Sequence, residues 1–544
     1  MREYTQMIEL LDCGLLSAQI HKYIRDPIHI YVPFSKLEEK IIDSGIFQRL
    51  RRIHQLQVAY SVYPGATHNR FIHSIGVMHL AGKFTVALLR TSHAYSGQEV
   101  PRLPKHGATY YVPTYEELGI DNGGVLLSVL LAVRLGGLLH DVGHMPYSHA
   151  FDEAVIARSP EIKSVGIRSH EDTGYLIFRN FLRGIIEDFV VEKYSVFGLD
   201  EKIVVDCLDY ILRPRESIGN PSLPVYDVVR HVIKEFVYPA DIVDFCMRDS
   251  YFTGAIEYGR IDVDRLFLFS IIIRRKTGGR EESVPPYIGL MRKAIGALRA
   301  FLYSRLWLFN NVYFHKFSRL MDYTVKELLV KMYDKQIIDF AEIFAGIAKG
   351  DRSILEKLEK LDDGYILYKA LESGDSELIE LARRIMYRKP YLKEVFSQEI
   401  TIHQMDILAA NKCRRTFEEV KDRLRTIIGE ELNIAPEDII IDSPPIKFFP
   451  LNPYLPFSMF PLIDVEKHKI VAVREENAWR ITGTKMLDFA VLRILLPRHI
   501  IKQTGISEAE IRRKISTIMG EELEEEIKMA FIRKYSSYSY TVTM

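Results

Sequence analysis

Cysteine is scarce in this chain: among 544 residues there are only Cys13, Cys207, Cys246 and Cys413, which stand far apart and form no C-x-x-C pair. That scarcity argues against a disulfide scaffold or a zinc finger and suits a reducing compartment. Excess charge is also missing, because 72 Lys and Arg balance 72 Asp and Glu. The chain therefore has no global attraction to an anionic membrane or to nucleic acid, and a local basic patch is left open.

Long apolar runs are missing too. The most apolar window, residues 125–133, is followed by Arg134 and is shorter than the roughly 20 residues that a membrane span needs. The first residues, MREYTQMIELLDCGLLSAQ, contain no signal-peptide core or cleavage site. We therefore expect a soluble cytoplasmic protein without a membrane segment.

Several common catalytic motifs are absent. There is no P-loop and no strand-placed G-x-G-x-x-G, which argues against Walker-type and Rossmann nucleotide sites. There is also no G-x-S-x-G elbow and no H-E-x-x-H motif. Histidine and aspartate are left as the residues that carry the chemistry.

The length of the chain predicts two or three domains, because 544 residues exceed what one compact core accommodates. Apolar residues recur at helical spacing through most of it, which predicts a mainly α protein. The helical ranges are 37–60, 72–92, 124–141, 170–190, 225–252, 290–335 and 352–385.

Two segments interrupt the helical pattern. Residues 94–123 are rich in Gly, Pro and Tyr, which predicts a long inserted loop that acts as a lid or an interface element. Residues 439–481 combine prolines with β-branched runs, which predicts short strands, and residues 507–535 return to helix. We place a boundary near residue 330, between a helical domain (1–330) and a mixed region (331–544) that we expect to build an interface.

The stretch GGLLHDVGHMPYSHAF (136–151) holds three of the 17 histidines. A single His-Asp doublet is expected by chance, so the surroundings carry the signal. Upstream, His68, Arg70 and His73 open a predicted helix, and downstream His170 and Glu171 open another. Two further histidine-bearing segments therefore accompany the stretch that holds the His140-Asp141 doublet.

Acidic residues recur on one helical face further along, in YPADIVDFCMRDSYF (238–252). Asp244 and Arg248 fit either an exposed ion pair or part of a site, and both interpretations stay open. Asp241 lies in a half-apolar helix, where a buried carboxylate needs a cation. The resulting mixed nitrogen and oxygen donor set suits Fe, Mn, Zn, Co or Ni, and its members are His73, His140, Asp141 and Asp241.

Taken together, the motifs resemble those of the HD-domain metal phosphohydrolases, and among these the deoxynucleoside triphosphate (dNTP) triphosphohydrolases. The similarity covers roughly residues 20–330 and rests on the ordered stretches FQRLRRIHQLQVAYSVYPGATHNRFIHSIGVMHLAG, LLHDVGHMPYSHAFD, HE and DIVDFCMRD. It implies a helical HD-domain core with a smaller α+β C-terminal region. It also implies metal-dependent hydrolysis of dNTPs to deoxynucleoside and triphosphate.

The resemblance assigns roles by position. It makes His73, His140, Asp141 and Asp241 the metal ligands. The histidines that contact phosphate and transfer protons are His144, His149 and His170, oriented by Asp152 and Glu171. The substrate contacts are Gln55, Leu56, Arg70, Asp249, Arg305 and Tyr313.

A guanine nucleotide activator site would use Asp43, Gln48 and Arg51, although Arg49, Arg51 and Arg52 also fit a solvated helix face. Magnesium on the substrate phosphates and a homo-oligomer, dimer or tetramer, are implied as well.

The chain departs from the family pattern at the nucleotide-binding helix. Ile242 replaces a lysine after the metal aspartate, and Phe245 replaces a tyrosine. Phe314 replaces a glutamine that contacts the base. Two alternatives therefore stand beside dNTP hydrolysis: an HD phosphohydrolase acting on another nucleotide or phosphoester, and a nucleotide- or nucleic-acid-binding regulator with little turnover. We expect His54, His79 and His315 to be structural.

Overall fold

The computed structural model describes residues 11–100, 108–277, 285–403, 416–447, 459–477, 481 and 486–537. They form two compact units, each assembled from three separate stretches of chain. The first unit comprises the described residues of Met1–Ser304, Val325–Ala382 and Pro461–Glu475, and the second those of Arg305–Thr324, Arg383–Phe460 and Glu476–Met544. This grouping differs from the predicted boundary near residue 330, because two later stretches return to pack within the first unit.

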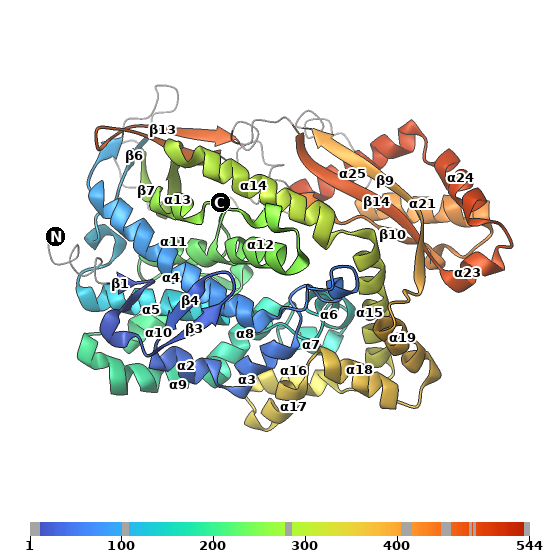
Figure 1. Cartoon of the computed structure of the whole chain (residues 1–544), viewed down its shortest axis with the longest axis horizontal. Coiled ribbons are helices and arrows are strands. Elements are labelled where there is room, and N and C mark those ends of the chain that lie inside the picture. Colours follow the sequence, from blue (N-terminus) through green and yellow to red (C-terminus); the bar gives the residue numbers. More distant parts are fainter. Residues whose placement is uncertain are drawn as a thin grey trace. The chain divides into compact units, whose positions relative to one another are not determined.

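Helices make up most of the first unit, which confirms the predicted mainly α fold. Helices α4 and α5 pack together and run through it, with α10, α11 and α12 against them (Figure 1). Both α4 and α5 begin at an asparagine N-cap, Asn69 and Asn122, whose side chain accepts a hydrogen bond from the first turn. The helices up to residue 268 are α2 (Lys36–Ile42), α3 (Gly45–Gln48), α4 (Arg70–Ala94), α5 (Gly123–Leu139), α6 (His149–Phe151), α7 (Pro160–Ser164), α8 (His170–Ile177), α9 (Arg183–Phe189), α10 (Glu201–Leu212), α11 (Val225–Ile233), α12 (Ala240–Thr253) and α13 (Val263–Leu268).

Further helices follow the sheet strands. They are α14 (Ile295–Leu308), α15 (Lys316–Asp334), α16 (Phe340–Lys349), α17 (Leu355–Lys360), α18 (Asp363–Glu372) and α19 (Ser376–Met386). Helices α16, α17 and α18 lie wholly in the first unit. Within this unit, α16 packs on α7 and α8, and α17 packs on α3. The predicted helical range 352–385 is confirmed, and it consists of the three successive helices α17, α18 and α19.

Helix α4 is the one described helix that is long and apolar enough to cross a membrane on length and composition. Its apolar window has a mean hydropathy of 1.4, and 83% of that window is buried inside the fold. Core packing therefore accounts for its apolar surface. Helix α5, which contains the predicted apolar window, is shorter.

The first unit also contains a sheet, of which the sequence pattern predicted only the strands within residues 439–481. Its strand order is β13-β12-β8-β7-β6-β5. Strands β5 (Glu99–Val100) and β6 (Ala108–Tyr111) come from the segment predicted as a loop, and β6 pairs antiparallel with β7 (Ser270–Thr277). Strand β12 (Met459–Glu466) joins in parallel to β8 (Tyr287–Met291), and β13 (Lys469–Asn477) follows it. Residues 101–107 of the predicted loop lie outside the described residues.

Short hairpins open the chain. Strands β1 (Leu11–Asp12) and β2 (Leu15–Leu16) pair with each other, as do β3 (Lys22–Asp26) and β4 (Ile30–Phe34). Asp26 ends β3 as a buried carboxylate. Helix α2 then starts at Ser35 with a capping box, in which Ser35 and Glu38 bond each other's backbone.

The second unit is an α+β assembly around a four-stranded sheet. The long strands β9 (Leu392–His403) and β14 (Met486–Pro497) pair antiparallel, and β10 (Ile440–Asp442) and β11 (Pro445–Lys447) also pair with β14. Helices α21 (Phe417–Leu432), α24 (Glu508–Ile518) and α25 (Glu521–Ser537) share one apolar core with the sheet, and α23 (Arg498–Gln503) follows β14 (Figure 1). The predicted smaller α+β C-terminal region is confirmed, although part of the predicted strand segment, 448–458, lies outside the described residues.

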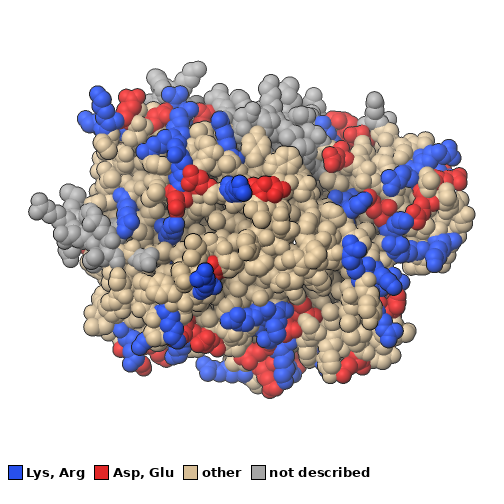
Figure 2. All heavy atoms as spheres, in the orientation of Figure 1, with Lys and Arg blue, Asp and Glu red and all other residues tan. Residues whose placement is uncertain are grey.

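Surface charge follows the balanced composition. On the face drawn in Figure 2, Lys and Arg alternate with Asp and Glu, and the coloured residues form no large field of one sign. The described residues on this face therefore present no broad patch of one sign.

Candidate functional site

Four predicted metal ligands meet where three helix ends converge in the first unit. His73 lies in the first turn of α4, His140 and Asp141 follow the last residue of α5, and Asp241 lies in the first turn of α12. His73 Nε2 is 3.1 Å from Asp241 Oδ1 and 3.9 Å from Asp141 Oδ2. His140 Nε2 is 3.6 Å from Asp241 Oδ1 and 3.4 Å from Asp141 Oδ1. The structure thus brings all four together.

The Nδ1 atoms of both imidazoles, which face away from the shared centre, already have hydrogen-bond partners. His73 Nδ1 donates to Asp244 Oδ2 at 2.8 Å, and His140 Nδ1 donates to the carbonyl oxygen of Gly137 at 2.8 Å. Each ring therefore turns an Nε2 lone pair towards the shared centre. His140 Nε2 is buried and has no hydrogen-bond partner among the described residues. The ligand atoms of His73, His140 and Asp141 lie within 4.8 Å of one another, as a single metal ion requires, and Asp241 adjoins both histidines. Imidazole nitrogens and carboxylates of this kind fit a divalent transition metal.

The electrostatics of this group favour a bound cation. Burial disfavours charge on the His73 ring, but hydrogen bonds to Asp241 and Asp244 outweigh it and raise the pKa of His73 to about 10. Burial likewise opposes ionisation of Asp241, whereas His140 and His73 lower the pKa of this carboxyl below its usual value. The carboxylates stay charged and the site attracts positive charge, either a proton or a metal.

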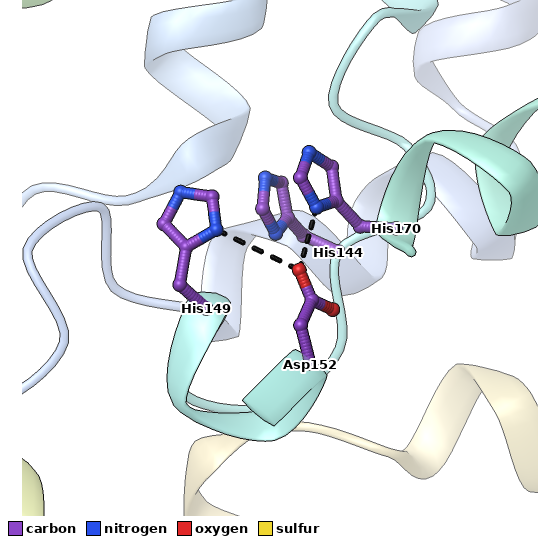
Figure 3. Close-up of side chains that lie close together, drawn as sticks. All are labelled: His144, His149, Asp152 and His170. Carbon is purple, nitrogen blue, oxygen red and sulfur yellow. Dashed lines mark hydrogen bonds and ion pairs between the residues drawn. The ribbon is translucent and has the colours of Figure 1, made fainter. Parts of the chain in front are cut away.

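A second cluster lies beside the first: His144, His149, Asp152 and His170 (Figure 3). His170 Nδ1 donates to Asp152 Oδ2 at 2.6 Å, and His149 Nδ1 lies 3.6 Å from the same oxygen. The rings of His144 and His170 stack with their centroids 3.8 Å apart. Asp152 begins a π-helical turn (Asp152–Ile156), a local irregularity common at functional sites.

The members of this cluster differ in exposure and charge. Burial, followed by the charge of Arg70, lowers the pKa of His144 well below its usual value, so this ring stays neutral. Burial raises the pKa of Asp152, but hydrogen bonds from His149 and His170 outweigh it and hold that pKa well below its usual range. His149 is the accessible member, with 60% of its side chain exposed. Asp152 therefore presents a charged acceptor to both His149 and His170.

The two clusters are directly connected. His144 Nε2 lies 3.5 Å from Asp141 Oδ1, so the metal-ligand set and the histidine cluster are neighbours. Arg70 bridges the same region, since it pairs with Asp141 and donates from Nε to Ser148 Oγ at 2.7 Å. A cavity of about 80 Å³ adjoins both groups and is lined by residues that include His140, Asp141, His170, Glu171, Lys234 and Asp241.

Glu171 has a different neighbour from the one predicted. Its carboxylate lies 3.6 Å from Lys234 Nζ, at the wall of the same cavity. The carboxylate that contacts the histidines is Asp152. The orienting role predicted for both acids is thus carried, in the geometry, by Asp152.

The predicted substrate residues of the first unit have different surroundings, and among them Arg70 contacts the metal-ligand set through Asp141. Gln55 and Leu56 are half-buried, and the backbone N–H of Gln55 donates to the backbone carbonyl oxygen of His68. Asp249 is buried and accepts a hydrogen bond from His68 Nε2 at 2.7 Å. Asp249 is therefore already paired with a histidine side chain.

Arg305 and Tyr313 belong to the second unit. Arg305 is buried on α14 with its guanidinium 4.7 Å from the centroid of the Phe309 ring. Tyr313 packs edge-on against the same ring, 4.8 Å between centroids. Both residues thus surround Phe309, and their predicted substrate contacts stay predictions.

Of the predicted activator residues, two are in contact. Arg51 Nε donates to Gln48 Oε1 at 2.7 Å, and its guanidinium lies 3.5 Å from the centroid of the Phe71 ring. Asp43 is the exposed C-cap of α2. The neighbouring Arg49 is fully buried, so the alternative of one solvated arginine face is wrong for that residue.

The sequence pattern missed a buried charge network behind His73. Arg248 pairs with Asp244 on its own helix and with Asp26 at the end of β3, and His29 Nε2 bonds Asp244 at 2.6 Å. The predicted Asp244–Arg248 pair exists, but it is buried, so the exposed-pair interpretation is wrong. Its i, i+4 spacing was visible in the sequence, whereas the partners from the N-terminal hairpin carried no local signal.

Comparison with known proteins agrees with this geometry. Residues 70–194 match the HD domain model, and residues 284–451 match the HD associated region. The chain is therefore an HD-domain protein.

Its relatives include enzymes that act on deoxynucleotides. The chain is 30% identical over 393 residues to the human deoxynucleoside triphosphate triphosphohydrolase SAMHD1, with 68% of this chain and 55% of that protein covered. The mouse protein of the same name is 28% identical over 420 residues, covering 72% of this chain and 56% of that protein. Uncharacterized protein YwfO of Bacillus subtilis (strain 168) is 26% identical over 386 residues, with 69% of this chain and 72% of that protein covered. The chain thus spans just over half the length of the two mammalian proteins.

Proposed function

We propose that this protein is a metal-dependent phosphohydrolase that cleaves dNTPs to deoxynucleoside and triphosphate. The observation that carries the proposal is the 3.5 Å approach of His144 to Asp141, which places a proton-transfer cluster beside a metal-ligand set. Similarity to the mammalian triphosphohydrolases supports the choice of substrate. The alternative, another nucleotide or phosphoester, is favoured by Ile242 and Phe245, where the family has a lysine and a tyrosine.

The residues divide the reaction between them. His73, His140, Asp141 and Asp241 would hold one divalent cation of Fe, Mn, Zn, Co or Ni, which supplies Lewis-acid activation of a water near neutral pH. The water oxygen bonds to the α-phosphorus, and the bond from that phosphorus to the 5′-oxygen breaks. His149, exposed and backed by Asp152, delivers the proton that the departing 5′-oxygen needs. Arg70 adds positive charge beside Asp141, and magnesium would neutralise the remaining phosphates.

One product analysis tests the proposal. Protein reconstituted with each metal is incubated with every dNTP, NTP and dNMP, and the products are resolved by anion-exchange chromatography. Triphosphate together with deoxynucleoside is the expected result. Phosphate released from a monophosphate would instead support the second candidate, and nucleotide binding without turnover would support a regulator. Asp141→Ala should remove both metal and activity, and retained activity would contradict the site.

We further propose a homo-oligomer, dimer or tetramer, with a guanine nucleotide activator at Asp43, Gln48 and Arg51. The contact between Gln48 and Arg51 supports this site, because it sets an amide and a guanidinium side by side for a polar ligand. Light scattering and hydrolysis rates, each measured with and without GTP, test both points. If neither the mass of the oligomer nor the hydrolysis rate changes when GTP is added, the proposed activator site is excluded.

A further inference from the structure

The loop that carries the catalytic histidines has a strained backbone. Between His144 and His149, Tyr147 and Ser148 have φ values of 57° and 53°, in the left-handed region that favours glycine. Ser148 combines its φ with a ψ of −119°, outside the regular conformations. Such residues each cost about 1–3 kcal/mol and persist only where the surroundings impose them. Something in the fold must therefore hold this loop.

Asp363, the first residue of α18, holds it directly. Its Oδ1 accepts a hydrogen bond from the amide of Tyr147 at 2.7 Å, and its carbonyl oxygen accepts one from the Tyr147 hydroxyl at 3.3 Å. Asp363 is only 4% exposed, and Tyr147 only 1%. A buried carboxylate that accepts a backbone N–H makes a strong, charge-assisted hydrogen bond. Its position in the first turn of a helix further stabilises the negative charge.

The other oxygen of the same carboxylate holds a second segment. Asp363 Oδ2 accepts hydrogen bonds from the His54 amide at 2.9 Å and from His54 Nδ1 at 2.8 Å. His54 immediately precedes Gln55 and Leu56, two of the predicted substrate contacts. One carboxylate therefore connects the substrate-contacting turn with the catalytic loop.

Arg49 strengthens the same connection. Fully buried, it donates to the carbonyl oxygens of Val142 at 2.9 Å and His144 at 2.8 Å, and it lies within 3.5 Å of the carbonyl oxygen of Leu361. Arg52 pairs with Asp362, the N-cap of α18. The start of α18 is thus fixed to both segments by charged hydrogen bonds.

We propose that Asp363 is a positioning residue that sets His149 and the turn at Gln55 in the geometry the reaction needs, an inference that rests on the proposed function. Asp363 lies far outside the matched HD domain, within the HD associated region. Through Asp363 that region thereby contributes to catalysis from a residue that does not touch substrate. Misplacing a reacting group by about 1 Å can lower the rate on the order of 100-fold.

Adjacent aspartates provide a matched test. Asp363→Ala removes both sets of hydrogen bonds, and we expect kcat to fall about 10- to 100-fold with metal content unchanged. Asp363→Asn keeps one oxygen acceptor and should recover part of the rate. Asp362→Ala removes the α18 N-cap and the pairing with Arg52 but leaves the Asp363 hydrogen bonds to His54 and Tyr147, so it should lower stability and reduce kcat much less than Asp363→Ala does. Wild-type kcat in Asp363→Ala, or an equal loss in Asp362→Ala, would overturn the proposal.

Hydrogen exchange gives a readout independent of turnover. Peptides covering residues 142–150 should exchange faster in Asp363→Ala and Asp363→Asn than in Asp362→Ala, in which only α18 should loosen. Equal exchange of this segment in all three variants would overturn the inference. If wild-type protein hydrolyses no dNTP, the proposed function fails, while exchange still decides whether Asp363 holds the loop.

Discussion

The two ring nitrogens of His73 have different partners, and the difference defines its part in the site. Nδ1 donates to the buried Asp244, while Nε2 faces Asp141 and Asp241. Carboxylates that hold the outer nitrogen of a metal-binding histidine fix its tautomer and increase its basicity. Asp244 would therefore act on a metal bound by His73 without being a ligand itself.

Replacing Asp244 by Asn should weaken metal binding by about 10- to 100-fold, because the amide removes the charge that orients His73. Chelator competition measures the affinity. Asp264→Asn is the control, since Asp264 is 65% exposed on α13 and pairs only at the surface with Lys83. Unchanged affinity in Asp244→Asn, in protein shown to be folded by circular dichroism, would refute the orienting role.

Replacing His149 by Ala should lower kcat by roughly 10²- to 10⁴-fold, the usual contribution of a general acid. Metal content should stay at the wild-type level, because His149 belongs to the second cluster and its side chain is 60% exposed. Single-turnover rates and metal analysis on the same sample measure the two quantities. A variant with wild-type kcat would move the proton transfer to another residue.

Residue identities at the site were predictable to different degrees. His73, His140 and Asp141 could be found because their spacing and flanking motifs are local, and the structure brings them together. Asp363 could not be found, since its partners His54 and Tyr147 lie more than 200 positions away in the chain. Nothing in the sequence around residue 363 indicates such contacts.

At the scale of elements, the close approach of α12 to α4 depends on Gly76. Any Cβ at this position would overlap Asp244 and Arg248, which press against the α4 backbone one turn beyond His73. The absence of a side chain thus lets the buried charge network reach the metal-ligand helix. Helix α4 itself was well predicted, because an apolar, well-capped helix is specified locally.

Gly76→Ala should destabilise the protein by about 1–3 kcal/mol, the usual cost of overpacking. Denaturant unfolding measures the loss, and metal affinity should fall with it because His73 shifts. Gly184→Ala in α9 is the matched control: a Cβ there meets nothing within 4 Å, so stability should stay level or rise by up to about 1 kcal/mol. Equal stability of both variants would contradict the packing argument.

Other elements were mispredicted for physical reasons. The range 37–60 is helical only in short pieces, because Ser44 caps a new helix just after α2 ends at Ile42. The predicted loop at 94–123 contributes β6, whose partner β7 lies more than 150 residues further on. Strand pairing over such distances leaves little trace in local composition.

At the scale of the whole molecule, a buried charge cluster stabilises the second unit. Asp442 at the end of β10 accepts from Arg319 at 2.7 Å and from Arg493 at 3.1 Å. Burial raises the pKa of Asp442, but the two guanidinium groups outweigh it and lower that pKa below its usual value. The stabilisation is therefore complete above the unfolded value of 3.8 and is lost as the pH falls through the folded pKa.

Asp442→Asn should cost about 3–5 kcal/mol at pH 7, since two buried cations lose their main partner. Urea unfolding followed by hydrogen exchange in β9 and β14 measures the change in the second unit. The difference from wild type should narrow as the pH falls below about 4, because the Asp442 carboxyl of the unfolded chain then binds a proton while that of the folded chain is still ionised. A difference that is the same at pH 3 and pH 7 would contradict the role of the charge.

The interleaving of the two units has a consequence for how the protein is made. The first unit takes β12 and β13 from Pro461–Glu475, and Asp363 comes from a stretch that follows a segment of the second unit. During synthesis the loop at Tyr147 therefore lacks its contact with Asp363 until residue 363 has left the ribosome, and the six-stranded sheet is incomplete until residue 475 has done so. Until then the edge of β8 is unpaired, and nascent chains with such an edge are aggregation-prone and dependent on chaperones. A truncation near residue 330 would keep the HD motif and remove both completing pieces.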